Sequence, residues 1–183
     1  MNVVLMGYRG TGKSSVGERL SRVLHLPFYD TDTLIEELAR KTIQEMVDEM
    51  GWGFFREKER EVIKGLAAVT DSVIATGGGA LMDQKNAEIL KRKGVFVWLT
   101  ADTETIIGRI KTDTAGVKKR PPFSHADLLQ ETIKALEERT PVYRRLADFS
   151  IDTTEREIDG IVAQICRFLE KRGQRGNRVG DSD

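Results

Sequence analysis

Short apolar runs alternate along the chain with longer stretches in which apolar residues return at every third or fourth position. The runs are rich in β-branched and aromatic residues, which is typical of strands buried on both faces of a parallel sheet. The longer stretches have the period of helices that bury one side. Five strands separated by helices predict a three-layer α/β/α fold around a central parallel sheet. The expected strands span 3–6, 26–29, 72–76, 95–99 and 149–152, and the expected helices span 16–24, 34–40, 42–50, 55–66, 83–92, 102–111, 128–139 and 155–171.

The length of 183 residues fits a single domain, which we place at residues 1–172. Residues 173–183 are polar and rich in glycine, so we expect a disordered tail there. The chain balances 29 lysines and arginines against 29 aspartates and glutamates, which suggests neither a nucleic acid nor a membrane as partner. Its single cysteine, Cys166, fits a reducing cytosol, and the first strand leaves no room for a signal peptide. We expect a cytoplasmic monomer.

The strand at 3–6 leads into a glycine-rich stretch, Gly7-Tyr8-Arg9-Gly10-Thr11-Gly12-Lys13-Ser14, which matches the P-loop pattern G-x-x-x-x-G-K-[ST] without a gap. The strand, the glycine-rich stretch and a helix follow one another in the order that aims backbone N–H groups at an anion. In that geometry Lys13 reaches the β- and γ-phosphates of a nucleotide, and the Ser14 hydroxyl binds Mg²⁺. Chance matches should arise in under ~1% of chains this long at ordinary residue frequencies. The stretch therefore predicts a site for nucleotide phosphates.

Two carboxylates, Asp30 and Asp32, follow the second expected strand. Thr33 and Glu36 have the spacing of a capping box, so we expect Thr33 to cap the next helix and leave both aspartates for another purpose. Residues two apart in an extended chain point to the same side, which would place both carboxylates at the ligand-binding end of the sheet. The alternative is a solvated turn in which another residue caps the helix.

Three consecutive glycines at 77–79 follow the third expected strand. They indicate either a close approach of the backbone to a bound molecule or a flexible loop before the next helix. Arg56 lies in a run of six charged residues, for which a solvated helix face is the default interpretation. The pattern alone does not separate Arg56 from Lys58 or Arg60.

Residues 112–124 lack an apolar period and contain a basic, proline-stiffened segment around Arg120. Because phosphoryl transfer needs cations and the exclusion of water, we expect a lid at about 112–125, the alternative being an ordinary surface loop. Further along, Arg139 and Tyr143 flank Pro141, and this proline is expected to end or kink the helix before it.

These features occur in one order: the P-loop, Asp30-Thr31-Asp32, Phe55-Arg56, Gly77-Gly78-Gly79, Arg120-Pro121 and Arg139-x-Pro-x-Tyr143. The set resembles the shikimate kinase family, and the spacing agrees over nearly the whole chain except the tail. This resemblance implies a P-loop kinase with the fold of nucleoside-monophosphate kinases and the strand order 2-3-1-4-5. It also implies that the γ-phosphate of ATP is transferred to the 3-hydroxyl of shikimate, with Mg²⁺ as cofactor.

The resemblance further implies a role for each candidate residue, with the acceptor held by residues of about 31–60 together with the later motifs. ATP would be bound by Gly10, Thr11, Gly12, Lys13, Ser14 and Ser15, with Arg109 and Arg156 beside the adenine. Shikimate would be bound by Asp32, Arg56, Gly77, Gly78, Gly79 and Arg139. Ser14 and Asp30 would hold the metal. Lys13, Asp32 and Arg120 would be catalytic, Asp32 orienting the hydroxyl or taking its proton and Arg120 contacting the transferred phosphate.

Three other functions stay open at this point. A gluconate or nucleoside-monophosphate kinase would share the architecture, although the ordered motifs argue against it. A regulatory P-loop switch or ATPase is disfavoured because the chain lacks the Asn-Lys-x-Asp guanine signature and an apolar strand that ends in Asp-Glu. A binding module without activity would be expected to have lost Lys13 or Asp32, and both are present.

Overall fold

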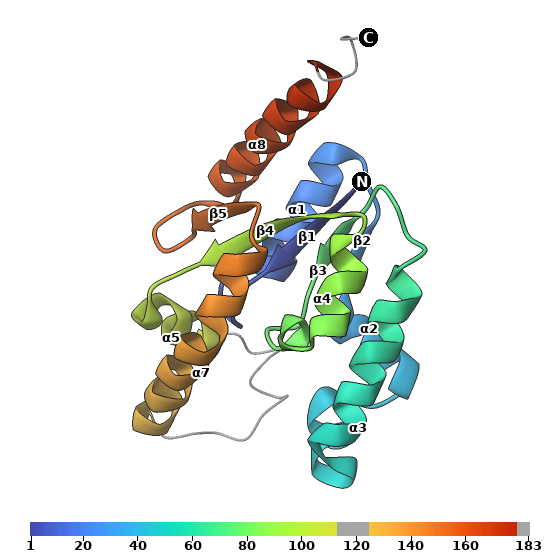
Figure 1. Ribbon diagram of the computed structural model, residues 1–183. Coiled ribbons are helices and arrows are strands. Elements are labelled where there is room, and N and C mark those ends of the chain that lie inside the picture. The colour runs from blue at the N-terminus through green and yellow to red at the C-terminus, as the bar shows by residue number, and fades with distance from the viewer. Residues whose placement is uncertain (113–124, 179–183) are drawn as a thin grey trace.

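The computed structural model describes residues 1–112 and 125–178, with the side chains of 125–126 and 175–178 left undescribed. Five parallel strands form one sheet in the order β2-β3-β1-β4-β5, as expected (Figure 1). The strands are β1 (Asn2–Met6), β2 (Phe28–Asp30), β3 (Val73–Ala75), β4 (Gly94–Thr100) and β5 (Phe149–Asp152). The helices are α1 (Lys13–Leu24), α2 (Thr31–Ala39), α3 (Ile43–Leu66), α4 (Gln84–Lys91), α5 (Thr103–Thr112), α7 (His125–Leu146) and α8 (Ile158–Arg178), with a short 3₁₀ turn, η1 (Ala80–Met82).

Helices cover both faces of the sheet, and the alternation of side chains along β1 shows how. Val3 and Leu5 pack against α1 and α8, whereas Val4 and Met6 pack on the opposite face against α3, α4 and α7. All four side chains are buried, which explains why the strand is an unbroken apolar run. Figure 1 shows α2 and α3 beside the β2 edge of the sheet, where they pack on each other around Ile35 and Met46.

The start of α2 differs from the prediction. Thr33 does not cap this helix; Asp30 does, and its side chain accepts hydrogen bonds from the N–H groups of Asp32 and Thr33. Asp30 keeps the extended conformation that an N-cap requires, so the helix begins at Thr31, three residues earlier than the spacing suggested. Asp32 therefore lies in the first turn of a helix rather than in a strand.

Three further boundaries differ. The two helices expected at 42–50 and 55–66 form one element, α3, which bends at Gly51 because this residue has the left-handed φ of 79°. Pro141 does not end α7, which continues to Leu146 and buries Tyr143 in the core beyond the proline. The last helix extends to Arg178, so residues 173–178 are helical where a tail was expected, and 179–183 lie outside the described residues. In the described part of the chain, none of the helices combines the length and the apolar character needed to cross a bilayer.

Candidate active site

The P-loop connects β1 to α1 in a tight turn that three glycines make possible. Gly7, Gly10 and Gly12 have φ values of 147°, 77° and 88°, a region that side chains disfavour. A side chain at Gly7 would also collide with the Leu99 carbonyl at the end of β4. The first turn of α1 begins directly after Gly12, so its free N–H groups face the loop and can receive an anion.

The polar side chains at the start of α1 meet the end of β2. The Lys13 ammonium donates to the Tyr8 carbonyl at 2.8 Å, and the Ser14 hydroxyl donates to Asp30 Oδ2 at 2.6 Å. Burial lowers the pKa of Lys13 to about 8, although the nearby carboxylates of Asp32 and Asp30 act in the opposite direction. The structure therefore brings Lys13, Ser14, Asp30 and Asp32 together at one end of the sheet.

The loop of three glycines at 77–79, called the glycine loop below, lies beside these groups, and buried side chains fix it at both ends. The Gly77 N–H donates to the Thr31 hydroxyl at 2.8 Å, and the Asn86 amide donates to the Ala80 carbonyl at 3.0 Å. Thr31 and Asn86 are both buried, so these hydrogen bonds are shielded from water. Both ends of the loop are therefore held by hydrogen bonds to buried side chains.

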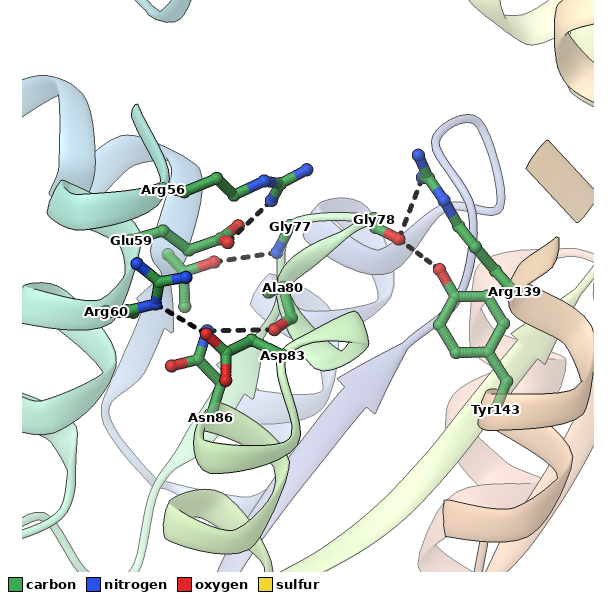
Figure 2. Close-up of polar contacts among 11 residues, drawn as sticks. Arg56, Glu59, Arg60, Gly77, Gly78, Ala80, Asp83, Asn86, Arg139 and Tyr143 are labelled. Carbon is green, nitrogen blue, oxygen red and sulfur yellow. Dashed lines mark hydrogen bonds and ion pairs between the residues drawn. The ribbon is translucent and has the colours of Figure 1, made fainter. Parts of the chain in front are cut away.

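The glycines leave room for the predicted substrate side chains. A Cβ atom at Gly77 would lie 2.5 Å from Asp32 Oδ1, and one at Gly79 would lie 2.6 Å from Arg56 Nη2. Arg139 donates from Nη1 to the Gly78 carbonyl at 3.0 Å. Figure 2 shows Arg56 and Arg139 approaching the glycine loop from opposite sides, from α3 and from α7. Two arginines and one carboxylate therefore converge on a single backbone segment.

The structure distinguishes Arg56 from its charged neighbours by its ion-pair partner, a distinction that the sequence pattern did not provide. Lys58 and Arg60 pair with Glu61 and Asp83, whereas Arg56 pairs with Glu59 at 2.6 Å beside the glycine loop. Only 1% of the Glu59 side chain is exposed, and its Oε1 atom has no hydrogen-bond partner among the described residues. Burial raises the pKa of Glu59, and the Arg56 guanidinium opposes that rise.

Glu59 was missed by the sequence analysis because it is one of three glutamates in the same charged run. Its position three residues after Arg56 places both on one face of α3, but that spacing is also typical of solvated ion pairs.

On the nucleotide side, Arg109 ties the P-loop to the segment after β5. Its guanidinium donates to the Gly10 carbonyl at 3.3 Å and to the Thr153 carbonyl at 2.6 Å. Arg156 is exposed on the following loop, before α8. Within the P-loop, Thr11 is buried and donates to the Tyr8 carbonyl, whereas Ser15 is exposed on the first turn of α1. Arg120 and the predicted lid lie outside the described residues.

Comparison with known proteins shows which family the chain belongs to. The family model described as shikimate kinase matches residues 9–170. The chain belongs to the shikimate kinase family. The shikimate kinase of Syntrophus aciditrophicus is 48% identical, with 93% of this chain and 92% of the relative covered.

Solved structures agree with this assignment to the shikimate kinase family. The shikimate kinase from Acinetobacter baumannii in complex with shikimate superposes with a TM-score of 0.86 at 31% identity, covering 93% of each chain. A gluconokinase from Sinorhizobium meliloti, in contrast, superposes with a TM-score of 0.62 at 23% identity. The second likeness shows the shared fold alone, so the gluconate kinase alternative finds less support than the shikimate kinase family.

Proposed function

We propose that this chain transfers the γ-phosphate of ATP to the 3-hydroxyl of shikimate and releases shikimate 3-phosphate and ADP. The observation that carries the proposal is the position of Gly78 between the two halves of the site. A Cβ atom on this residue would lie 3.4 Å from the Arg9 nitrogen in the P-loop and 3.4 Å from Nη1 of Arg139. An acceptor held at the glycine loop is therefore adjacent to the place where the P-loop receives a terminal phosphate.

ATP is bound through the backbone of the P-loop and the start of α1. Lys13 contacts the β- and γ-phosphates, and the remaining contacts come from Gly10, Thr11, Gly12, Ser14 and Ser15. Arg109 and Arg156 flank the adenine. The bonds from Arg109 to Gly10 and Thr153 support this role, since they join the phosphate side of the site to the segment that carries Arg156.

Mg²⁺ fits the oxygen atoms of Ser14 and Asp30. Their side chains lie 2.6 Å apart beside the P-loop, and both offer the oxygen ligands that Mg²⁺ prefers. The described residues contain no group of three or more His, Cys, Asp or Glu side chains arranged around a metal. This suits an ion that takes most of its ligands from phosphates and water. When bound, Mg²⁺ neutralises charge that develops on the β- and γ-phosphate oxygens.

Shikimate is a carboxylate with a ring of hydroxyl groups, and the acceptor side of the site offers partners for both. Arg56 and Arg139 bind the carboxylate, because a guanidinium fork matches its geometry. Asp32 accepts a hydrogen bond from the 3-hydroxyl. The backbone N–H groups of Gly78 and Gly79 face the ring and have no protein acceptor among the described residues, whereas that of Gly77 donates to Thr31. This acceptor-binding part, about 31–60 with the glycine loop, belongs to the one domain at 1–172.

The transfer step then needs little covalent chemistry from the protein. The 3-hydroxyl oxygen forms a bond to the γ-phosphorus while the bond from that phosphorus to the bridging oxygen of ADP breaks, and Asp32 takes the hydroxyl proton. Lys13 and Arg120 neutralise the charge of the transferred group, Arg120 coming from the predicted lid at about 112–125. Because every candidate residue comes from one chain, we also propose that the enzyme works as a monomer, and we propose that it is cytoplasmic.

The test is a comparison of acceptors. Wild-type protein is incubated with Mg-ATP and, in separate reactions, with shikimate, gluconate or a set of nucleoside monophosphates, and the ADP formed is measured. We expect ADP release only with shikimate. Equal release with gluconate would favour a kinase of another hydroxy acid, and hydrolysis of ATP without any acceptor would favour an ATPase.

A further inference from the structure

The Gly78 carbonyl accepts hydrogen bonds from two side chains of α7. Arg139 donates from Nη1, and the Tyr143 hydroxyl donates from one turn further along the helix (Figure 2). We propose that Tyr143 is a positioning residue for the acceptor substrate, because it holds the Gly78–Gly79 peptide so that the Gly79 N–H faces the bound ring. This inference rests on the proposed function and assigns a role to a residue outside the predicted site.

The geometry of a peptide unit connects the hydroxyl to the substrate. A trans peptide is planar, so the carbonyl of Gly78 and the N–H of Gly79 point in opposite directions. With the carbonyl bonded to α7, the N–H points away from α7. Arg56 lies close to Gly79 on its other flank, since a Cβ atom there would come 2.6 Å from Nη2. Holding the carbonyl therefore keeps the Gly79 N–H pointing away from α7, as a free donor for a bound acceptor.

Glycine makes such an anchor necessary. Peptides between glycines rotate more freely than others, because no Cβ atom restricts the backbone. Thr31 and Asn86 fix the loop at Gly77 and Ala80, but neither contacts the peptide in between. The orientation of the Gly78–Gly79 peptide thus depends on the two donors from α7.

Tyr143 is the more permanent of those two donors. Arg139 is expected to bind the carboxylate of the substrate, so its bonds rearrange when shikimate arrives. The Tyr143 side chain is 2% exposed and its ring packs 6.0 Å from the ring of Trp98. Burial raises the pKa of Tyr143 to about 12, so the hydroxyl remains a donor throughout the pH range of an assay. The anchor is therefore in place before and after the substrate binds.

The experiment removes the hydroxyl and leaves the ring. Tyr143→Phe should raise the KM and the Kd for shikimate about tenfold, in line with the loss of one buried hydrogen bond, and leave the KM for ATP within about twofold. Tyr29→Phe is the matched control, since Tyr29 packs in the same apolar cluster and its hydroxyl makes no hydrogen bond with the described residues. Both of its KM values should stay at the wild-type level.

Two results would overturn the inference. A variant Tyr143→Phe with a lower Tm but an unchanged KM for shikimate would show that the hydroxyl only stabilises the core. Equal increases in KM for ATP and shikimate would show a general loosening of the site. If wild-type protein releases no ADP with shikimate, the proposed function and this inference both fail. If the wild type is active and Tyr143→Phe has the same KM for shikimate, only this inference fails.

A second variant tests the inference even if Tyr143→Phe folds poorly. Replacing Tyr143 by 3-fluorotyrosine keeps the shape of the side chain and makes the hydroxyl a stronger donor. The KM for shikimate should then stay equal to the wild-type value or fall. A rise in this KM would contradict the inference.

Discussion

Asp30 illustrates how one side chain serves both the fold and the site. One carboxylate oxygen caps α2, and the other accepts the Ser14 hydroxyl at 2.6 Å. The sequence analysis gave the cap to Thr33 and left Asp30 for another purpose, because a pattern of residue types does not show that the two oxygens point to different partners. The first position of α2 and the proposed metal site are therefore linked through a single residue.

Lys13 gives a prediction at this scale. Its pKa is lowered to about 8, so near that pH half of the free protein holds a neutral lysine. A bound triphosphate favours the charged form, and ATP binding should therefore take up protons at about pH 8.5, with an affinity that falls as the pH rises further. Titration calorimetry in two buffers with different ionisation enthalpies measures this uptake.

The control for that measurement is Lys13→Arg, which stays charged at every pH of the titration. The variant should bind ATP without the extra proton. Wild-type binding that is independent of buffer ionisation at the same pH would contradict the lowered pKa.

At the scale of elements, the close approach of Arg56 to the glycine loop allows a prediction about a substitution at Gly79. Gly79→Ala would place a methyl group 2.6 Å from Arg56 Nη2, and the flexible arginine side chain rather than the backbone should give way. We therefore expect a folded protein whose KM for shikimate rises at least about tenfold, as when a bidentate carboxylate contact is weakened. Steady-state kinetics with each substrate varied in turn measure the change.

Gly65→Ala in α3 is the matched control, since a Cβ atom there would meet nothing within 4 Å. Alanine also favours a helix over glycine, so this variant should be slightly more stable and fully active. Equal KM values for shikimate in Gly79→Ala and Gly65→Ala would remove Arg56 from the proposed site.

The helices and strands were largely predictable from apolar periodicity, and the exceptions have physical causes. The start of α2 was misplaced because Asp30 and Thr33 both have the chemistry of an N-cap, and only the extended backbone at Asp30 decides between them. Pro141 stays inside α7 because residues on both sides of it, Ala135 and Tyr143, are buried by tertiary packing. Such packing outweighs a local preference that a sequence window can reveal.

For the whole molecule, the strand order followed from the family resemblance and not from periodicity, which is the same for any order of parallel strands. The site residues divide in the same way, into those predicted from a local pattern and those inferred from the resemblance. The P-loop could be predicted from spacing alone, but Arg56 came from the resemblance, and Glu59 could not be separated from its neighbours. Contacts between β2, α3 and the glycine loop depend on chain segments that meet only after folding, and no local pattern encodes them.

Asp148 is the basis of a prediction about global stability, because it joins three parts of the molecule just before β5. Its carboxylate accepts from Lys91 of α4 at 2.6 Å and from the Phe96 N–H of β4 at 2.9 Å, and it lies 3.6 Å from Arg172 of α8. Burial alone would raise the pKa of Asp148, but these partners outweigh it and lower the pKa.

Asp148→Asn should lower the free energy of unfolding at pH 7 by about 2 kcal/mol, as expected for lost hydrogen bonds to a charged group. A carboxylate with a lowered pKa stabilises the fold above its unfolded pKa of about 4, and this contribution is lost as the pH falls through the folded pKa. The difference between variant and wild type, measured by urea denaturation, should therefore shrink below about pH 4. Asp159→Asn, which removes an exposed pair with Arg19, should change stability little at any pH. A pH-independent difference for Asp148→Asn would contradict the lowered pKa.

The register of the central strands has a consequence for inhibitor design. Leu5 of β1 pairs with Ala75 of β3, so the P-loop and the glycine loop emerge from adjacent strands that are about 4.8 Å apart. A compound that joins a phosphate mimic to a carboxylated ring would need only a short, stiff linker to occupy both loops at once. Tethering would turn the second contact into an intramolecular event with a high effective concentration, so two weak fragments could yield one tight bisubstrate ligand.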